Sequence, residues 1–418
     1  MIKVDEVYPI DINTTIGPTG TIKRLFRNRD YFRQRGYELT IFAGHPVKKR
    51  ILKYEYELRE LTVLPEDKNS GIMPDTINKG KLTSKIKSRM KRIIQGSRVM
   101  SAWNVRRATA DNKKEIEQYL ALDRNPDIIV FHEVDSCYHY YKLTEGKPHA
   151  KTAMFIHADG SRDAMFAKTY PQLVGTKTHR ELNERVDYAV AHCDKVVFIT
   201  HGAKGIFLSE NPGVNPDKVV TFHNGIDDMP VVKAEPSSPF KYRMCCTGTV
   251  CERKGQYLII EAMKQMKPEL LTDLHVTIMG TGPDHSKLIA KAEEYGLTEH
   301  VFFAGNIPNK QVHSKLCAEN IYILMSDNEG LPISILEAMR AGLPVISTKI
   351  AGIPEEVDDR NGVLINPDAK ELTDVLNRLD QYDWQQLGRQ SRERFENEFT
   401  FEIMRRYYAD LFDKIGHE

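Results

Sequence analysis

Short apolar runs rich in β-branched and aromatic residues alternate along this chain with stretches that have helical spacing. The clearest runs lie at 128–131, 153–156, 196–199, 219–222, 276–279, 301–303, 321–324 and 345–347. Runs of this kind are typical of strands that are buried on both faces, as in parallel sheets. Because crossover helices join parallel strands, the alternation predicts βαβ units and an α/β fold.

The second half of the chain shows this alternation most regularly. Its strands are expected near 243–249, 275–279, 301–303, 321–325 and 344–347. Helical stretches such as 255–266 and 284–295 lie between them, so the series predicts a doubly wound, Rossmann-like domain. The first half belongs to the same class but is less regular, and we expect a helix over 22–35 close to its start.

The length of 418 residues suits two domains. A stretch rich in Pro and Ser at 234–239 has the composition of a linker, so we place the boundary near 230–238. The predicted domains are 1–230 and 238–398. The C-terminal segment 399–418 carries apolar residues at helical spacing, and this helix is a candidate to pack back on the first domain.

Composition narrows the classes of function. Lys and Arg total 59 against 58 Asp and Glu, and a balance this even argues against a dedicated nucleic-acid binder. The six cysteines lack the spacing of a zinc site or a disulfide scaffold, so we expect no metal. No apolar run approaches the roughly 18 residues of a membrane span, and the N-terminus does not resemble a signal peptide. We therefore expect a cytoplasmic protein.

One segment departs from the balanced charge. Between 76 and 110 there are ten Lys or Arg residues and no Asp or Glu. Its centre, 85–94, mixes basic with apolar residues, as in basic amphipathic helices that lie on anionic membrane surfaces. An ordinary solvated helix has a similar composition, so the sequence leaves both interpretations open.

The most informative stretch is 326–346, which follows a predicted strand. Gly330 permits an unusual turn, and Pro332 suits the first turn of a helix. Gly342 suits the end of that helix before the next strand begins. This pattern predicts that Glu329 lies on the loop at the carboxyl end of a strand and Glu337 inside the following helix. Ligands of open α/β sheets bind at that edge, and a helix N-terminus there favours phosphate oxygens.

Within this frame the two glutamates resemble the retaining glycosyltransferases of family GT4, which share the two-domain GT-B fold. The family's hallmark is E-x7-E in the context E-G-x-x-x-x-x-L-E-A-M-x-x-G-x-P-V-I, and here that context runs from Glu329 to Ile346. The resemblance covers 195–400 well and the N-terminal half loosely. It implies two Rossmann-like domains facing across a cleft, with a nucleotide-sugar donor held by the second.

Other segments carry the same resemblance. The stretch 248–255 resembles the first strand–helix loop of the donor domain, where basic residues hold the diphosphate. Lys254 matches the Lys of that loop, whereas Thr249 stands where the family usually has Arg, and Arg253 is a candidate substitute. The segment with Asn306 and Ile307 resembles the loop that packs on the nucleotide base.

The resemblance therefore implies a set of donor-binding residues in the second half. They are Thr249, Arg253, Lys254, Asn306, Ile307, Glu329, Gly330, Leu331, Pro332, Ile333 and Glu337. Glu337 is implied to bind the ribose hydroxyls and Glu329 the sugar hydroxyls. Lys254 and the helix N-terminus can balance the charge of the departing diphosphate. The chain has no Asp-x-Asp, which argues against the metal-clamping GT-A fold. We expect the reaction to need neither a metal nor a cofactor.

In the first half, His157 ends a predicted strand, where family members often place a histidine that faces the reacting sugar. A histidine after a strand is usually structural, but the resemblance favours a functional role, and Asp159 could orient it or cap the turn. Gly17, Gly20 and Thr21 occupy the place of the family's glycine-rich loop, which approaches the donor phosphate and the acceptor. A plain connection between strand and helix is the alternative.

The function implied is a retaining, metal-independent glycosyltransferase with His157, Glu329 and Lys254 as catalytic residues. It would move a hexose or N-acetylhexosamine from a nucleotide-diphosphate sugar, with UDP as the expected nucleotide. The acceptor would be a glycan or lipid-linked acceptor in capsule or other surface polysaccharide biosynthesis, at the inner membrane face. Two alternatives stay open: a non-catalytic GT-B sugar-binding partner of another glycosyltransferase, or a nucleotide-sugar epimerase.

Overall fold

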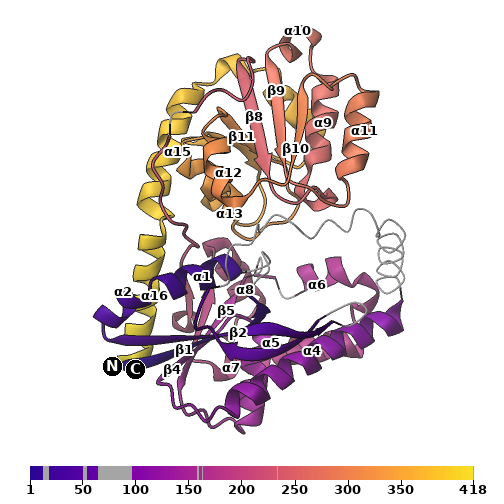
Figure 1. Cartoon of the computed structure of the whole chain (residues 1–418). Helices are drawn as coiled ribbons and strands as arrows, with labels where there is room; N and C mark the ends of the chain where they lie inside the picture. The colour runs from indigo at the N-terminus through magenta and orange to yellow at the C-terminus, as the bar shows by residue number, and fades with distance from the viewer. Residues whose placement is uncertain are drawn as a thin grey trace. The chain divides into compact units, whose positions relative to one another are not determined.

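The computed structural model describes residues 1–12, 18–49, 54–64, 97–157, 160–161, 163–232 and 234–417. Two compact units make up the chain, and both termini lie in the first (Figure 1). The first unit comprises Met1–Phe222 together with Arg405–Glu418, and the second comprises His223–Met404. Of the sequence predictions, Gly17, Asp159 and the part of the basic segment up to residue 96 fall outside the described residues.

The first unit has one seven-stranded sheet with the order β3-β2-β1-β4-β5-β6-β7. Its strands are β1 Ile2–Asp11, β2 Tyr37–Lys49, β3 Tyr54–Glu60, β4 Ile128–Phe131, β5 Lys151–Ile156, β6 Lys195–Phe198 and β7 Val219–Thr221. Neighbouring strands are parallel except at the edge, where β3 runs antiparallel to β2. The helices include α1 Thr19–Arg27, α2 Arg29–Gln34, α4 Arg98–Leu120, α5 Val134–Leu143, α6 Ala164–Thr169, α7 Lys177–His192 and α8 His201–Glu210.

The predicted single helix over 22–35 is wrong in two respects. It begins earlier, because Pro18 stands before α1 with φ −76° and Thr19 already has helical structure. It is also interrupted at Asn28, between α1 and α2. The Asn28 side chain donates a hydrogen bond to the Arg24 carbonyl at 2.9 Å, and side chains of this type compete with the helical backbone pattern.

The second unit has a six-stranded sheet with the order β10-β9-β8-β11-β12-β13, and its neighbouring strands are parallel. The strands are β8 Tyr242–Thr247, β9 Leu274–Met279, β10 Val301–Gly305, β11 Ile321–Leu324, β12 Val345–Thr348 and β13 Gly362–Ile365. The main helices are α9 Gln256–Gln265, α11 His285–Glu294, α12 Asn309–Leu316, α13 Ile333–Arg340, α14 Ala369–Leu376 and α15 Trp384–Glu398. The strand order reverses between β8 and β11, and such a switch point is where ligands bind in doubly wound sheets.

Two apolar clusters cover the two faces of this second sheet. On β11, Ile321 and Ile323 belong to one cluster, whereas Tyr322 and Leu324 belong to the other. Successive side chains of a strand point to opposite faces, so a continuous apolar run fills both layers. This explains why the buried strands of the second unit read as unbroken apolar runs in the sequence.

The division between the units falls between Phe222 and His223, ahead of the predicted boundary at 230–238. The chain joins the second unit before its Pro-rich stretch, because Ile226 is fully buried in the core of that unit. Ile226 also forms a parallel β-bridge with Thr400, in which its backbone hydrogen bonds run to the residues on either side of Thr400. A residue that is buried and paired in this way cannot belong to a linker.

The C-terminal helix α16, Phe401–His417, contributes its residues from Arg405 onward to the first unit. There Tyr408 stacks on Phe155 with ring centroids 5.3 Å apart, and Phe412 packs against Phe32 at 5.8 Å. Within the described part of the chain, no helix is both long and apolar enough to cross a membrane.

Candidate functional site

The loop after β8 carries two of the predicted cations, Arg253 and Lys254, in a short turn just ahead of α9. Gly255 ends this turn with φ +66°, a conformation that favours glycine. A Cβ atom at Gly255 would lie 1.9 Å from the Met325 carbonyl oxygen, so no side chain fits there. The glycine therefore lets the loop pack directly against the end of β11.

The loops after β9 and β10 lie against this first loop. The Val250 amide donates to the Thr281 carbonyl at 3.0 Å, and a Cβ atom at Gly282 would lie 2.2 Å from the Val250 carbonyl oxygen. Thr281 Oγ1 donates to Asn306 Oδ1 at 3.0 Å. Asn306, predicted to lie near the nucleotide base, is thus on the same edge of the sheet as the loop with the cations.

The side chain of Glu329 joins the loop after β11 to the loop after β8. Its Oε1 atom lies 2.6 Å from Lys254 Nζ and 2.9 Å from Arg253 Nη1. The Ser326 hydroxyl donates to the same oxygen at 2.9 Å. The Glu329 side chain is only 10% exposed and that of Lys254 13%, so their ion pair is largely shielded from water, whereas the Arg253 side chain is 45% exposed.

Arg253 has a second contact that fixes the two loops. Its Nη1 donates to the Asn328 carbonyl at 2.7 Å, and its own carbonyl accepts from the Asp327 amide at 2.9 Å. The two loops are therefore joined by a side-chain hydrogen bond and by a backbone hydrogen bond. The structure brings Arg253, Lys254 and Glu329 together, whereas the sequence analysis assigned them to separate parts of a ligand.

Glu356, which the sequence analysis missed, lies close enough to Glu329 and Lys254 to interact with their charges. Its side chain is fully buried, and neither carboxyl oxygen has a hydrogen-bond partner among the described residues. Burial, and then the charge of Glu329, raise the pKa of Glu356 well above its ordinary value, while Arg394 and Lys254 oppose this shift. The sequence held no usable signal, because Glu355 and Glu356 are adjacent acids in a short turn.

The predicted helix after Glu329 is present as α13, which follows Pro332 and begins at Ile333. Leu331 and Pro332 are buried, and Glu337 lies half-buried within the helix. The backbone amides of the first turn of α13 therefore follow directly on the loop that holds Glu329. This is the arrangement by which helix N-termini bind anions.

The remaining predicted site residues lie at different places. Thr249 accepts a hydrogen bond from Gln256 Nε2 at 3.1 Å through its carbonyl, and Ile307 packs against the core of the second unit. Gly20 and Thr21 lie in the first unit inside α1, and the Thr21 side chain is buried. The prediction that these two residues belong to a loop is therefore wrong, because α1 starts at Thr19.

His157 follows β5 in the first unit and is half-buried. Its Nε2 atom lies 3.3 Å from Nδ1 of His132, which follows β4. Burial, and then His132, lower the pKa of His157, so its imidazole is neutral near pH 7. The sequence analysis singled out His157 but missed His132, whose strand it had identified.

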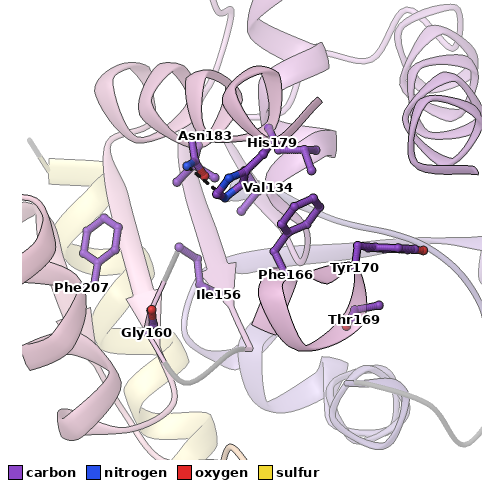
Figure 2. Close-up of a pocket in the computed structure, with 12 residues that line it drawn as sticks. Val134, Ile156, Gly160, Phe166, Thr169, Tyr170, His179, Asn183 and Phe207 are labelled. Carbon is purple, nitrogen blue, oxygen red and sulfur yellow. Dashed lines mark hydrogen bonds between the residues drawn. The ribbon is translucent and has the colours of Figure 1, made fainter. Parts of the chain in front are cut away.

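The first unit also has an apolar pocket of about 350 Å³ next to the end of β5 (Figure 2). Its lining residues are Val134, Ile156, Gly160, Ser161, Phe166, Thr169, Tyr170, His179, Leu182, Asn183, Val186 and Phe207. Phe166 stacks on His179 with centroids 4.7 Å apart, and His179 Nε2 is bonded to Asp163 at 2.7 Å. Sequence reasoning missed this pocket because its residues come from several separate helices.

With this geometry established, we compared the chain with known proteins. Residues 233–397 match the family described as Glycosyl transferases group 1. A colanic acid biosynthesis glycosyltransferase of Escherichia coli is 32% identical over 43% of this chain and 46% of that protein. An amylovoran biosynthesis glycosyltransferase of Erwinia amylovora is 24% identical over 91% of this chain and 93% of that protein. The match thus spans less than half of the first relative and nearly all of the second.

Solved structures agree with these relatives at the level of the fold. The crystal structure of the Anabaena protein HepE in complex with UDP has a TM-score of 0.60 and 15% identity, covering 99% of this chain and 100% of that one. At a sequence identity this low, the similarity shows only that the two proteins share a fold. Together with the family match, this shows that residues 233–397 are similar to the group 1 glycosyl transferases and that the chain has the GT-B fold.

Proposed function

We propose that this protein is a retaining, metal-independent glycosyltransferase. In this proposal it moves a hexose or N-acetylhexosamine from a UDP-sugar to a glycan or lipid-linked acceptor of a surface polysaccharide. The observation that carries it is the cluster of Arg253, Lys254 and Glu329 at the switch point of a group 1 domain. The names of the colanic acid and amylovoran relatives support a role in polysaccharide synthesis. The UDP complex of the Anabaena protein supports UDP as the nucleotide of the donor.

The charges of the cluster suit a diphosphate. Arg253 and Lys254 together carry two positive charges, and Glu329 balances one of them. An arriving diphosphate would share the two cations with Glu329, and the amides at the start of α13 would add donors. Glu337, inside α13, is proposed to accept hydrogen bonds from the ribose hydroxyls.

The same cations can stabilise the diphosphate as it leaves the sugar. Negative charge then builds on the β-phosphate, and fixed cations in a shielded site act on it without reorganisation. We propose that this replaces a metal ion. The three hydrogen-bond donors on Glu329 Oε1 reduce its nucleophilicity, which favours attack by the acceptor on the front face over a glycosyl–enzyme intermediate on Glu329.

The first unit suits an acceptor with an apolar part. Its pocket beside β5 has a mainly apolar lining with a few polar side chains, which suits the apolar part of a lipid-linked acceptor. At the start of α4, Val99 and Trp103 are 78% and 54% exposed, with Arg98 next to Val99 and Arg107 over the Trp103 ring. Exposed apolar side chains among arginines favour an anionic membrane surface.

Co-sedimentation with lipid vesicles tests this membrane contact. The protein should sediment with anionic vesicles at low salt and less at high salt, because surface charges are screened. Trp103→Ala should weaken the binding, whereas Leu122→Ala, which alters an exposed apolar residue just beyond the other end of α4, should not. Equal binding to neutral and anionic vesicles, or none to either, would contradict the proposal.

Donor turnover tests the enzymatic function. The purified protein would be incubated in EDTA with UDP-glucose, UDP-galactose, UDP-N-acetylglucosamine, GDP-mannose and ADP-glucose, and release of the nucleoside diphosphate recorded. We expect release from a UDP-sugar, with the α-anomer of the sugar appearing first by NMR. Glu329→Ala should lower the rate by about 100-fold or more.

The control for this experiment is Glu299→Ala, which removes an exposed carboxylate outside the cluster. Release that requires an added metal ion, or that yields the β-anomer first, would contradict the proposed mechanism. Binding of UDP-sugars without any release would instead support a non-catalytic sugar-binding partner.

A further inference from the structure

Three titratable side chains form a continuous hydrogen-bonded row inside the first unit. Glu6 lies on β1, His132 directly follows β4, and His157 directly follows β5, and these three strands are neighbours in the sheet. Glu6 Oε2 is 2.7 Å from His132 Nε2, and His132 Nδ1 is 3.3 Å from His157 Nε2. The row runs from the fully buried Glu6 to the half-buried His157.

Aromatic rings hold the two imidazoles in place. Phe155 stacks on His132 with centroids 5.0 Å apart and on His157 at 5.8 Å. Tyr8 meets the His132 ring edge-on at 5.9 Å, and Tyr408 in turn stacks on Phe155. Because the ring planes are fixed by packing on several sides, the positions of the protons are the main remaining freedom of the row.

Burial determines how many protons the row carries. It lowers the pKa of His132 to about 3, so that imidazole is neutral near pH 7. Burial, and then the neighbouring Asp5, raise the pKa of Glu6 well above its ordinary value. Asp5 itself is paired with Arg124 at 2.9 Å. The Glu6 Oε1 atom is buried without a hydrogen-bond partner among the described residues, an arrangement far less costly for a neutral acid than for a carboxylate.

With one proton on each of the three groups, the two hydrogen bonds that join them can run in only one direction. A protonated Glu6 donates from Oε2 to His132 Nε2, so the single proton of His132 lies on Nδ1. His132 Nδ1 then donates to His157 Nε2, and the single proton of His157 must lie on Nδ1. Removal of the Glu6 proton would reverse the direction of both hydrogen bonds and leave Nδ1 of His157 as an acceptor.

We propose that Glu6 is a positioning residue that acts through His132 to hold His157 in its Nδ1–H tautomer. His157 then offers a hydrogen-bond donor at the carboxyl end of β5. Such a donor recognises an oxygen lone pair, as on a sugar hydroxyl or ring oxygen, and it disfavours a ligand that presents a donor of its own. The substrate part of this inference rests on the proposed glycosyltransferase function, whereas the tautomer does not.

Nitrogen-15 NMR of the full chain, labelled at histidine, tests the tautomer directly. The His157 and His132 signals would be identified by their loss in His157→Gln and His132→Phe. At pH 7 we expect both imidazoles to be neutral, with the proton on Nδ1 and none on Nε2. A wild-type His157 with its proton on Nε2 would overturn the proposal.

Two substitutions of Glu6 separate its donor function from its packing. Glu6→Gln keeps an N–H group that can donate to His132 Nε2 and should preserve the His157 tautomer. Glu6→Met removes the donor and should spread His157 over both tautomers. If Glu6→Met does not fold, His132→Phe breaks the row while keeping a ring stacked on Phe155, and it should have the same effect. An unchanged His157 tautomer in the variant that folds would contradict the proposal.

Turnover measurements extend the test to the substrate. Glu6→Met should lower kcat for the donor sugar about 3- to 10-fold, with KM nearly unchanged and with recovery in Glu6→Gln. Equal losses in Glu6→Met and Glu6→Gln would show that Glu6 acts by packing alone. Absence of turnover in the wild-type protein would refute the proposed function. The NMR result alone would then test the proposed tautomer of His157.

Discussion

Glu329 is the residue at which two strand-end loops of the second unit meet. One of its oxygens accepts from Lys254, Arg253 and Ser326, so the cations are already held in place without any ligand. Ion pairs that are this shielded are costly to break unless another anion takes over. A diphosphate is such an anion: by sharing the two cations with Glu329, it would weaken their contacts with the carboxylate, which could then also bind the sugar.

Glu356 gives a prediction at the scale of a single residue. Because its pKa is raised in the folded protein, the wild type loses stability as the pH rises from the unfolded pKa toward the folded one. Glu356→Gln has no such proton to lose. We expect the stability of this variant, relative to wild type, to increase from pH 5 to pH 8, because folded wild type holds the Glu356 proton to a higher pH than the unfolded chain does.

Thermal unfolding of the wild type and of Glu356→Gln at the two pH values provides the measurement. Glu299→Gln, at an exposed position, serves as the control and should show no pH-dependent difference. A relative stability of Glu356→Gln that stays constant or falls between pH 5 and pH 8 would show that Glu356 is ionised in the folded protein.

At the scale of elements, the site depends on loops that approach each other closely enough to exclude a Cβ atom. Gly255→Ala would place a methyl group against the Met325 carbonyl in a left-handed conformation. Gly296→Ala meets the same left-handed conformation, with φ +69°, but has nothing within 4 Å. Comparison of the two substitutions separates the free-energy cost of backbone strain from that of the steric clash.

We expect Gly296→Ala to lower the free energy of unfolding by about 1 kcal/mol, and Gly255→Ala by at least about 2 kcal/mol more. Denaturant unfolding followed by circular dichroism measures both values. Gly255→Ala should also weaken nucleotide binding, because it displaces the loop that carries Lys254. Equal destabilisation by the two substitutions would mean that the loop can move away from β11 at little cost.

The order of elements around the motif 326–346 was predictable from the positions of its proline and glycine residues. The structure has β11, α13 and β12 where the sequence predicted strand, helix and strand, because Pro332 and Gly342 fix the ends of the helix. The break at Asn28 was not predictable in the same way. It depends on a side chain bonding to its own helix, a competition that apolar spacing does not record.

At the scale of the whole molecule, residues from the C-terminal end of the chain complete the core of the first unit. Tyr408 in α16 is fully buried and stacks on Phe155, whereas its neighbour Tyr407 is 43% exposed. Tyr408→Ala should therefore cost about 3–5 kcal/mol, as for other large core aromatics, and Tyr407→Ala about 1 kcal/mol. Hydrogen exchange in β5 should accelerate in Tyr408→Ala and not in Tyr407→Ala; unchanged protection of β5 would contradict this account.

The buried charges of the first unit show the limit of reasoning from sequence. Asp5 and Glu6 interrupt the apolar pattern of the first strand, and nothing near them in the sequence explains their burial. Their partners Arg124 and His132 lie more than a hundred residues away. Local patterns predict which segments form strands, but only the order of the strands in the sheet brings such partners together.

Calorimetric titration with UDP tests whether Arg253, Lys254 and Glu329 form the site for the donor diphosphate. Lys254→Ala should weaken UDP binding by about 10- to 100-fold, as expected for a shielded bond between a cation and a phosphate. Glu329→Gln should bind UDP at least as tightly as wild type, because the cations no longer have a competing anion. Lys267→Ala, at an exposed position, should have no effect. Equal UDP affinity in wild type and Lys254→Ala would contradict the account.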